Sequence, residues 1–157
     1  MGISLPASIV FHSAKVFFDD VSSLSPKRLF DSGAEPALLD FIAQVQEQDN
    51  WCWSAVATSI GLFYGSGNWT QCVITTEQVN SVIYPGEQND CCINPTSDHC
   101  DVYGYLYFSL QQVRSFDYWE SQKPTADTLF KILSRQRELL CLRIAWVGNG
   151  AHFTTIC

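Results

Sequence analysis

The cysteine between two tryptophans, in Trp51-Cys52-Trp53, is the residue of this sequence best suited to covalent chemistry. A thiol attacks a carbonyl carbon as the thiolate, and a free cysteine has a pKa of about 8.5, so neutral-pH reactivity needs a site that favours the anion. A helix start is such a site, because its unpaired N–H groups and its dipole favour negative charge. The residues after Cys52 predict a buried helix, so we expect Cys52 to be a nucleophile.

A thiolate nucleophile also needs an imidazole beside it, and the sequence offers His12, His99 and His152. His12 lies in the N-terminal segment and His99 in a cysteine-rich loop, whereas His152 begins a predicted strand directly after a glycine-rich turn. A strand end next to a turn can present a side chain to a separate helix. We therefore expect His152 to be the general base.

Acyl transfer further requires hydrogen-bond donors for the developing oxyanion. The backbone N–H of Cys52 is one natural donor, because the first turn of a helix has unpaired N–H groups. The side-chain amide of Gln46, six residues upstream, is the expected second donor, and Gln48 is the nearer alternative.

These residues together resemble the papain-like cysteine proteases, through Gln46-x5-Cys52-Trp53 and the later Gly150-Ala151-His152-Phe153. The resemblance is closest to a compact bacterial branch, which includes secreted effector proteases of plant pathogens and is related to the bacteriocin-leader peptidases. It covers about residues 40–157. The further stretches that carry it are Gln46 through Ala57, Thr70-Gln71-Cys72, Asp90-Cys91-Cys92 and Arg143-Ile144-Ala145-Trp146.

The resemblance implies a cysteine peptidase that hydrolyses peptide bonds of a peptide or protein substrate through a thioacyl-enzyme, without a metal or cofactor. It implies Cys52 as nucleophile, His152 as base and imidazolium partner, and Gln46 as oxyanion donor. Papain-like enzymes normally have an Asp or Asn beyond the histidine, whereas the sequence ends five residues after His152. We expect either a truncated sequence, an earlier acid in that role, or a slower enzyme without it; Asn149 is one candidate.

Periodicity and turn residues predict helices followed by an antiparallel hairpin, which is an α+β arrangement. The resemblance implies the papain-like version of it, with a central helix carrying Cys52 packed on a C-terminal antiparallel sheet. We expect Asp49 or Asn50 to cap the central helix, and Thr75 with Gln78 to form a capping box on the second. The predicted elements are a strand or hairpin arm in 8–18, helices from 53 to the Gly65 stop, from 75 to the Pro85-Gly86 stop, over 106–113 and from Pro124-Thr125 onward, and strands over 139–146 and 152–157.

A chain of 157 residues is long enough for one domain. Residues 19–37 are rich in acids, serines and prolines and have the composition of a linker. We therefore expect an N-terminal arm and linker over 1–37 and a papain-like protease domain over 38–157.

Six cysteines remain besides Cys52, an even number that suits disulfides. Four of them, Cys72, Cys91, Cys92 and Cys100, predict two local bridges. A hairpin symmetric about Asn149 would also place Cys141 opposite Cys157, on the face away from His152, where a cross-strand bridge could form. The alternative for the four clustered cysteines is a zinc site with His99, although no C-x2-C spacing is present. Disulfides would indicate a secreted or periplasmic protein, and reduced thiols a cytoplasmic one.

The net charge of −7 argues against a nucleic-acid partner, because such a negative field repels phosphate. All nine Lys and Arg lie at or before Arg28 or at and beyond Arg114, and ten acids lie between those positions. No apolar run reaches the roughly 18 residues of a membrane span, and no secretory signal is visible in residues 1–18.

Three other interpretations of the same residues remain open. Cys52 could be a buried inert thiol, which is the common state of a cysteine on an apolar helix. The protein could be a degenerate protease that keeps the cleft as a binding module without turnover. A related acyl-transfer enzyme, such as a transglutaminase or an amidase, would use the same residues, and an amine-acceptor assay would distinguish it.

Overall fold

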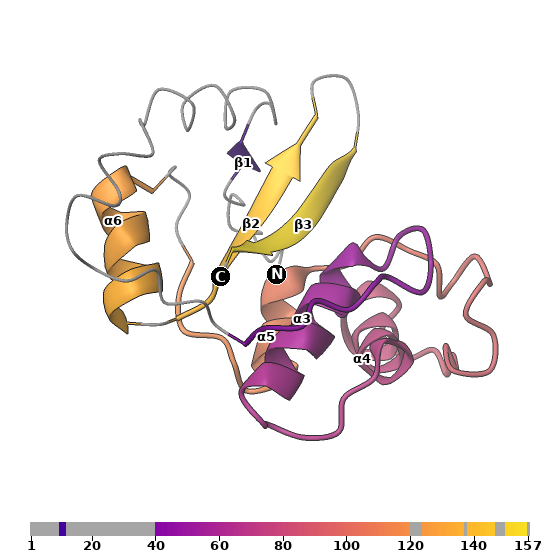
Figure 1. The fold of residues 1–157 in the computed structure, drawn as a ribbon. Helices are drawn as coiled ribbons and strands as arrows, with labels where there is room; N and C mark the ends of the chain where they lie inside the picture. The colour runs from indigo at the N-terminus through magenta and orange to yellow at the C-terminus, as the bar shows by residue number, and fades with distance from the viewer. Residues whose placement is uncertain (1–9, 12–39, 120–123, 137, 147–149, 157) are drawn as a thin grey trace. The chain divides into compact units, whose positions relative to one another are not determined.

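The chain has an α+β fold, with helices in its middle part and a small sheet completed at its C-terminal end (Figure 1). The computed structural model describes residues 10–11, 40–119, 124–136, 138–146 and 150–156. Contacts divide the chain into two compact units, and Phe41–Tyr118 forms one of them. The other unit contains the sheet and the last helices. The division into an arm over 1–37 and a domain over 38–157 stays a prediction.

The Phe41–Tyr118 unit is built around α3 (Cys52–Phe63), which packs against both α4 (Gln71–Gln78) and α5 (Leu106–Gln112). Nine of the twelve residues of α3 are buried, so this helix forms the centre of the unit rather than a surface layer. Its predicted stop is confirmed, because α3 ends just before Gly65, whose positive φ of 63° suits glycine. The short helix predicted over 106–113 is also confirmed as α5.

The second helix begins earlier than predicted, which corrects the capping box at Thr75. The N-cap is Thr70, whose hydroxyl accepts a hydrogen bond from the Val73 N–H at 3.4 Å. Thr75 is instead fully buried inside α4. The helix continues as a π-helical segment, η1 (Val79–Ile83), and ends before Pro85-Gly86 as predicted.

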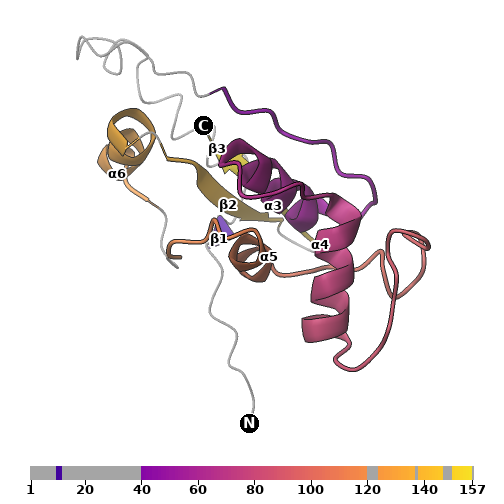
Figure 2. The ribbon, with the colours of Figure 1, turned by 90° about the horizontal axis from the view of Figure 1, so that it is seen from below.

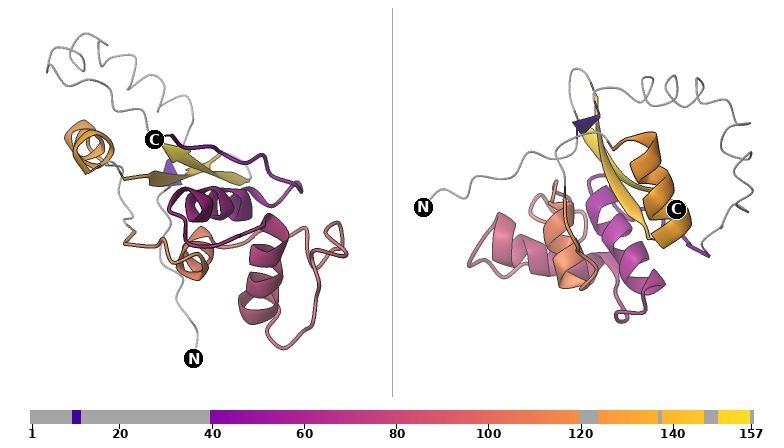
Figure 3. Two further views of the ribbon diagram at one scale, coloured as in Figure 1. Left: turned by 60° about the horizontal axis from the view of Figure 1, so that its bottom comes forward. Right: turned by 90° about the vertical axis from the view of Figure 1, so that its left-hand side faces the viewer.

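An extended segment, residues 41–47, runs beside α3 before the chain enters that helix (Figures 2 and 3). The Gln44 N–H donates to the Ser59 hydroxyl of α3 at 2.9 Å. Gln71, the first residue of α4, binds the same segment from its own side chain. Side chains of two helices, Ser59 of α3 and Gln71 of α4, therefore hold residues 41–47 in place.

The cysteine-rich loop is closed by two disulfides, Cys72–Cys92 and Cys91–Cys100, which confirms the prediction of two local bridges. Cys91 and Cys100 are buried in a small core with Trp51 and Val79. Since the four sulfur atoms are paired with one another, they are not thiolate ligands, and the zinc interpretation of this cluster is not supported. Two disulfides are compatible with a protein that lies outside the cytoplasm.

The other unit contains a three-stranded sheet in the order β1 (Val10–Phe11), β2 (Leu140–Ala145), β3 (Ala151–Ile156). β1 pairs with β2 in parallel, and β2 pairs with β3 as the predicted antiparallel hairpin. The remainder of the predicted 8–18 arm and the turn at 147–149 lie outside the described residues. The helix predicted from Pro124-Thr125 is present, with α6 (Ala126–Phe130) followed by the π-helical η2 (Lys131–Gln136).

The hairpin register corrects the predicted bridge between Cys141 and Cys157. Cys141 pairs with Thr155, because Ala145 pairs with Ala151 and the hairpin is centred one residue before Asn149. Cys141 is a free thiol. It lies on the face of the sheet opposite His152, as predicted. Burial raises the pKa of the Cys141 thiol to about 12.

Two further properties of the chain bear on its function. No helix among the described residues has the length and apolarity that crossing a membrane requires. The net charge is confined to one unit: Phe41–Tyr118 contains eight acidic residues and one basic residue, Arg114, whereas the rest of the chain contains eight of each. The whole formal charge of −7 therefore belongs to the unit that contains Cys52.

Candidate active site

Both tryptophans beside Cys52 are structural anchors. The indole N–H of Trp51 donates to the Cys100 carbonyl at 2.8 Å, and that of Trp53 donates to the Val102 carbonyl at 3.1 Å. Trp51 is fully buried and Trp53 is 1% exposed. A buried indole N–H needs such a partner, so both rings are fixed in place. The Trp-Cys-Trp motif is therefore attached to the segment that follows the Cys91–Cys100 disulfide.

Gly104 provides the space that Trp53 occupies. A Cβ atom at this position would lie 2.3 Å from Cε2 of Trp53 and 2.6 Å from Oε1 of Gln78. Only glycine therefore lets the backbone of residue 104 approach the indole this closely. Trp53 is therefore part of the hydrophobic core.

Cys52 is the first residue of α3, as predicted, and it carries a free thiol that is 7% exposed. No side chain caps this helix, which corrects the expected cap by Asp49 or Asn50. Within the described part of the chain, the backbone N–H groups of Cys52, Trp53 and Ser54 have no hydrogen-bond partner. These three residues are buried. A buried helix start without partners is unusual, and it leaves three donors next to the thiol.

Asn50 lies one residue before the N-cap position of α3, which is Trp51, and it is bound elsewhere. Its backbone N–H donates to Oδ1 of Asp101 at 2.9 Å, and its side-chain Nδ2 donates to the Asp101 carbonyl oxygen at 3.0 Å. This pair of bonds joins residues 51 positions apart in the sequence. The partner of Asn50 is Asp101, which lies far away in the sequence, so the residues around Asn50 do not reveal it.

Gln46 lies close to the chain that enters α3, in the same unit as Cys52. Its amide nitrogen donates to the carbonyl oxygens of Gln48 at 3.0 Å and Asp49 at 2.9 Å. Both amide hydrogens are therefore engaged by the loop before Cys52. To act as an oxyanion donor, Gln46 would have to release one of them.

Gln71 fixes the backbone on both sides of Gln46. Its Oε1 accepts from the Glu47 N–H at 3.0 Å, and its Nε2 donates to the Val45 carbonyl at 2.8 Å. The Gln71 carbonyl also accepts from the Ser54 hydroxyl at 2.8 Å. Gln71 is 1% exposed, so this side chain is a buried clamp. This role was not predicted from the sequence, because the residues around Gln71 give no sign that its side chain is buried.

His152 lies on β3, in the unit that does not contain Cys52 and Gln46. It pairs with Ile144 across the hairpin, and its side chain is exposed. Its position near the start of a strand confirms the local prediction. The candidate orienting residue Asn149 lies outside the described residues.

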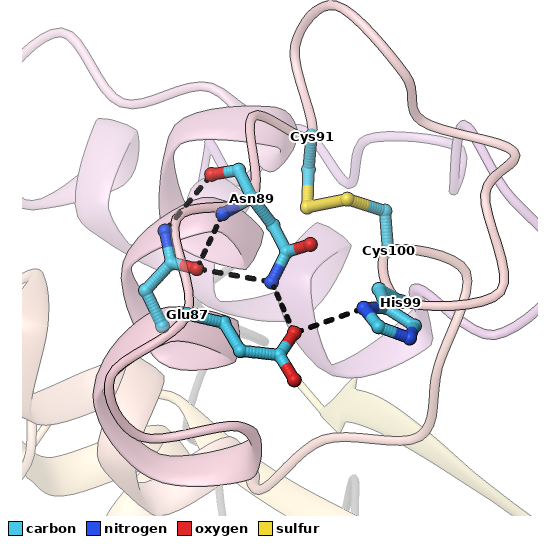
Figure 4. Close-up of polar contacts among 6 residues, drawn as sticks. Glu87, Asn89, Cys91, His99 and Cys100 are labelled. Atoms are coloured by element: carbon cyan, nitrogen blue, oxygen red, sulfur yellow. Dashed lines mark hydrogen bonds and ion pairs between the residues drawn. A yellow bond between two sulfur atoms is a disulfide. The ribbon is translucent and has the colours of Figure 1, made fainter.

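His99 belongs to a separate polar cluster on the cysteine-rich loop (Figure 4). Its Nδ1 lies 2.9 Å from Oε2 of Glu87, which also accepts from Nδ2 of Asn89 at 3.1 Å. The ring of Tyr84 lies against His99, with a centroid distance of 4.9 Å. These contacts hold the loop together beside the Cys91–Cys100 disulfide, and they give His99 a local structural role.

Comparison of the chain with known proteins gives no match, either to a family model, to a curated protein or to a solved structure.

Proposed function

We propose that this protein is a cysteine peptidase with a papain-like domain over residues 38–157. The observation that supports this best is the start of α3, where the free Cys52 thiol stands beside three buried backbone N–H groups without partners. Such donors favour a thiolate, and they favour the oxyanion that forms when it attacks a carbonyl.

The proposed reaction uses Cys52, His152 and Gln46. The Cys52 sulfur forms a bond to the carbonyl carbon of the peptide, and the carbonyl oxygen becomes an oxyanion that accepts from the Cys52 N–H and the Gln46 amide. The carbon–nitrogen bond then breaks as the His152 imidazolium gives its proton to the leaving amine. Water, deprotonated by neutral His152, attacks the thioester and releases the acid together with the Cys52 thiol.

The substrate is proposed to be a basic or neutral peptide. The unit that contains Cys52 carries eight acidic residues and one basic residue, so its field attracts cations and repels anions. Cleavage of matched basic and acidic peptides at low and high salt tests this preference. Equal cleavage of both peptides at low salt would contradict it. The two disulfides support a secreted or periplasmic location for this activity.

Covalent labelling tests the nucleophile directly. Intact-mass detection of the reaction with a papain-type epoxide inhibitor at mildly acidic pH should show one fast adduct on the wild-type protein. Cys52→Ser should remove the adduct, and His152→Ala should slow it strongly because the thiolate loses its imidazolium partner. Slow labelling that is equal in the wild type and His152→Ala would contradict the proposal.

A non-catalytic binding module is the second candidate, and the hydrogen bonds of Gln46 favour it. Both amide hydrogens of this residue are donated to the carbonyls of Gln48 and Asp49, as a purely structural glutamine would donate them. Peptide binding without turnover, at equal affinity in the wild type and Cys52→Ala, would support this function over catalysis.

A further inference from the structure

Residues 41–47 form an extended segment beside α3, and much of this segment faces solvent (Figure 2). Its four consecutive residues 42–45 are all exposed. Two of them have large apolar side chains: Ile42 is 79% exposed and Val45 is 85% exposed. A chain that lies along the segment would remove this apolar surface from water, which is favourable.

The backbone of this segment also has free hydrogen-bonding groups. Within the described part of the chain, the N–H and C=O groups of Ile42, Ala43 and Gln46 and the C=O group of Gln44 have no hydrogen-bond partner. An extended backbone with unpaired groups is a template to which another extended chain can add.

Gln71 shows that the segment accepts a partner of this kind. Its side-chain amide donates to the Val45 carbonyl at 2.8 Å and accepts from the Glu47 N–H at 3.0 Å. One residue of a parallel strand makes the same pair of bonds, to a carbonyl and to the N–H two positions further on. The segment therefore presents backbone groups with the spacing that strand pairing uses.

The charge around the segment selects the partner. Glu47 and Asp49 are exposed at and just beyond its end, and Arg114 is the one basic residue of the Phe41–Tyr118 unit. This field attracts an extended chain that carries Lys or Arg, whereas it repels a second copy of the same acidic unit. The complementary partner is therefore a basic peptide.

We infer that residues 41–47 are a docking surface to which a basic peptide adds as an extended strand, with its apolar side chains over Ile42 and Val45. Main-chain hydrogen bonds supply affinity in this mode of recognition, and the side chains supply specificity. The inference concerns binding alone. It does not rest on the proposed function, because it holds whether or not the bound chain is cleaved.

Fluorescence anisotropy of the labelled peptide KVTVTVK, measured at low salt with the full chain as its Cys52→Ala variant, tests this docking without turnover. We expect the matched acidic peptide EVTVTVE to bind about tenfold more weakly, because the acidic unit repels it. N-methylation of two adjacent central residues of KVTVTVK removes one N–H from each edge of the peptide. It should weaken binding about tenfold, because main-chain hydrogen bonds are lost.

Ile42→Ser tests the apolar contact. It should weaken the binding of KVTVTVK about threefold, the effect of losing one cross-strand side-chain pair. Ile93→Ser is the matched control, because Ile93 is 72% exposed on the cysteine-rich loop of the same unit. It should leave the affinity unchanged.

A charge reversal tests the electrostatic selection. Glu47→Lys/Asp49→Lys should weaken the binding of KVTVTVK about tenfold and strengthen that of EVTVTVE. Asp98→Lys/Asp117→Lys makes the same net change at exposed positions elsewhere in the unit, and it should have a smaller effect because screening limits the range of exposed charges.

The outcomes separate this inference from the proposed function. Equal binding of KVTVTVK and its N-methylated form, or an Ile42→Ser effect no larger than that of Ile93→Ser, would overturn the docking surface and leave the proposed peptidase intact. A dimer in sedimentation velocity that Ile42→Ser abolishes would show that a second copy occupies the segment, and it would overturn a peptide as the partner. Peptide binding as expected, in a protein whose Cys52 fails to react with the epoxide, would overturn the proposed function alone.

Discussion

Replacing Gly104 by alanine should destabilise the Phe41–Tyr118 unit strongly, because the new methyl group has no space. Its carbon would lie 2.3 Å from Cε2 of Trp53 and 2.6 Å from Oε1 of Gln78. Neither neighbour can move freely. Trp53 is 1% exposed, and its indole N–H donates to the Val102 carbonyl. Gln78 is 2% exposed; its side-chain amide donates to the Tyr105 carbonyl and accepts from the Tyr105 N–H.

The size of the effect follows from these contacts. Overpacking a buried site costs typically about 1–3 kcal/mol, and this overlap is at the severe end. Moving Trp53 or Gln78 would in addition break a buried hydrogen bond, which contributes about 1 kcal/mol. We expect Gly104→Ala to lower the free energy of unfolding by about 4 kcal/mol.

Urea unfolding under non-reducing conditions, followed by tryptophan fluorescence, measures this loss. With a slope of about 2 kcal/mol/M, the midpoint should fall by about 2 M while the slope stays constant. Gly65→Ala is the matched control. Position 65 has a φ of 63° and no heavy atom within 4 Å of an added Cβ, so alanine there meets only the left-handed backbone cost of about 1 kcal/mol. A Gly104→Ala loss no larger than the Gly65→Ala loss would refute the steric argument.

Three other perturbations have defined outcomes. Gln71→Leu leaves the Glu47 N–H and the Val45 carbonyl without their part-buried hydrogen bonds and should cost about 2 kcal/mol in urea unfolding. Gln112→Leu, on an exposed side-chain hydrogen bond, should cost under about 0.5 kcal/mol, and equal losses would count against the clamp. Replacing both Cys91 and Cys100 by serine opens a bridge with a sequence separation of 9 and should lower the free energy of unfolding by about 2.7 kcal/mol, a prediction that an unchanged urea midpoint would contradict. Burial raises the pKa of the Cys141 thiol to about 12, well above that of a thiol in the unfolded chain, so between these two pKa values the unfolded chain binds fewer protons and the free energy of unfolding should fall as the pH rises toward 12. Cys141→Ala should lack this component of the slope in urea titrations across that range, and identical slopes would show that the thiol is not buried.

Elements with local signals were predictable from the sequence. α3 has a helical apolar pattern and a glycine stop, and Gly65 adopts the positive φ that this stop requires. α6 begins after Thr125, whose hydroxyl accepts from the Thr128 N–H at 3.1 Å, as a capping threonine should. The hairpin around Gly150 also follows from strand propensity and turn residues. Each of these signals acts over a few residues.

Features that depend on distant partners were not predictable. The N-cap rule predicted that Asp49 or Asn50 would cap α3, but the N-cap position falls on Trp51, and Asn50 is instead hydrogen-bonded to Asp101, 51 positions away. The hairpin register was wrong by one position in its centre, because the pairing of Ala145 with Ala151 is set by the whole ladder rather than by the glycines.

In the candidate site, too, the features set by neighbouring residues were predictable and those set by distant residues were not. The position of Cys52 at a helix start could be predicted from its flanking residues. The buried clamp of Gln71 and the space at Gly104 could not, since both depend on side chains that approach from elsewhere in the chain.

Because Cys91 and Cys92 are adjacent and belong to different disulfides, the chain can exchange their partners during oxidation. The native bridges span separations of 20 and 9, and exchanging the partners of the two adjacent cysteines would shorten each loop by only one residue. Loop-closure entropy distinguishes these two pairings by about 0.1 kcal/mol, which is too little to select one. Selection must come from the unequal surroundings of the neighbours: Cys91 is fully buried beside Trp51, whereas Cys92 is exposed. Correct oxidation therefore requires that the tryptophan core form first, because a chain oxidised while unfolded would form these two pairings in nearly equal amounts.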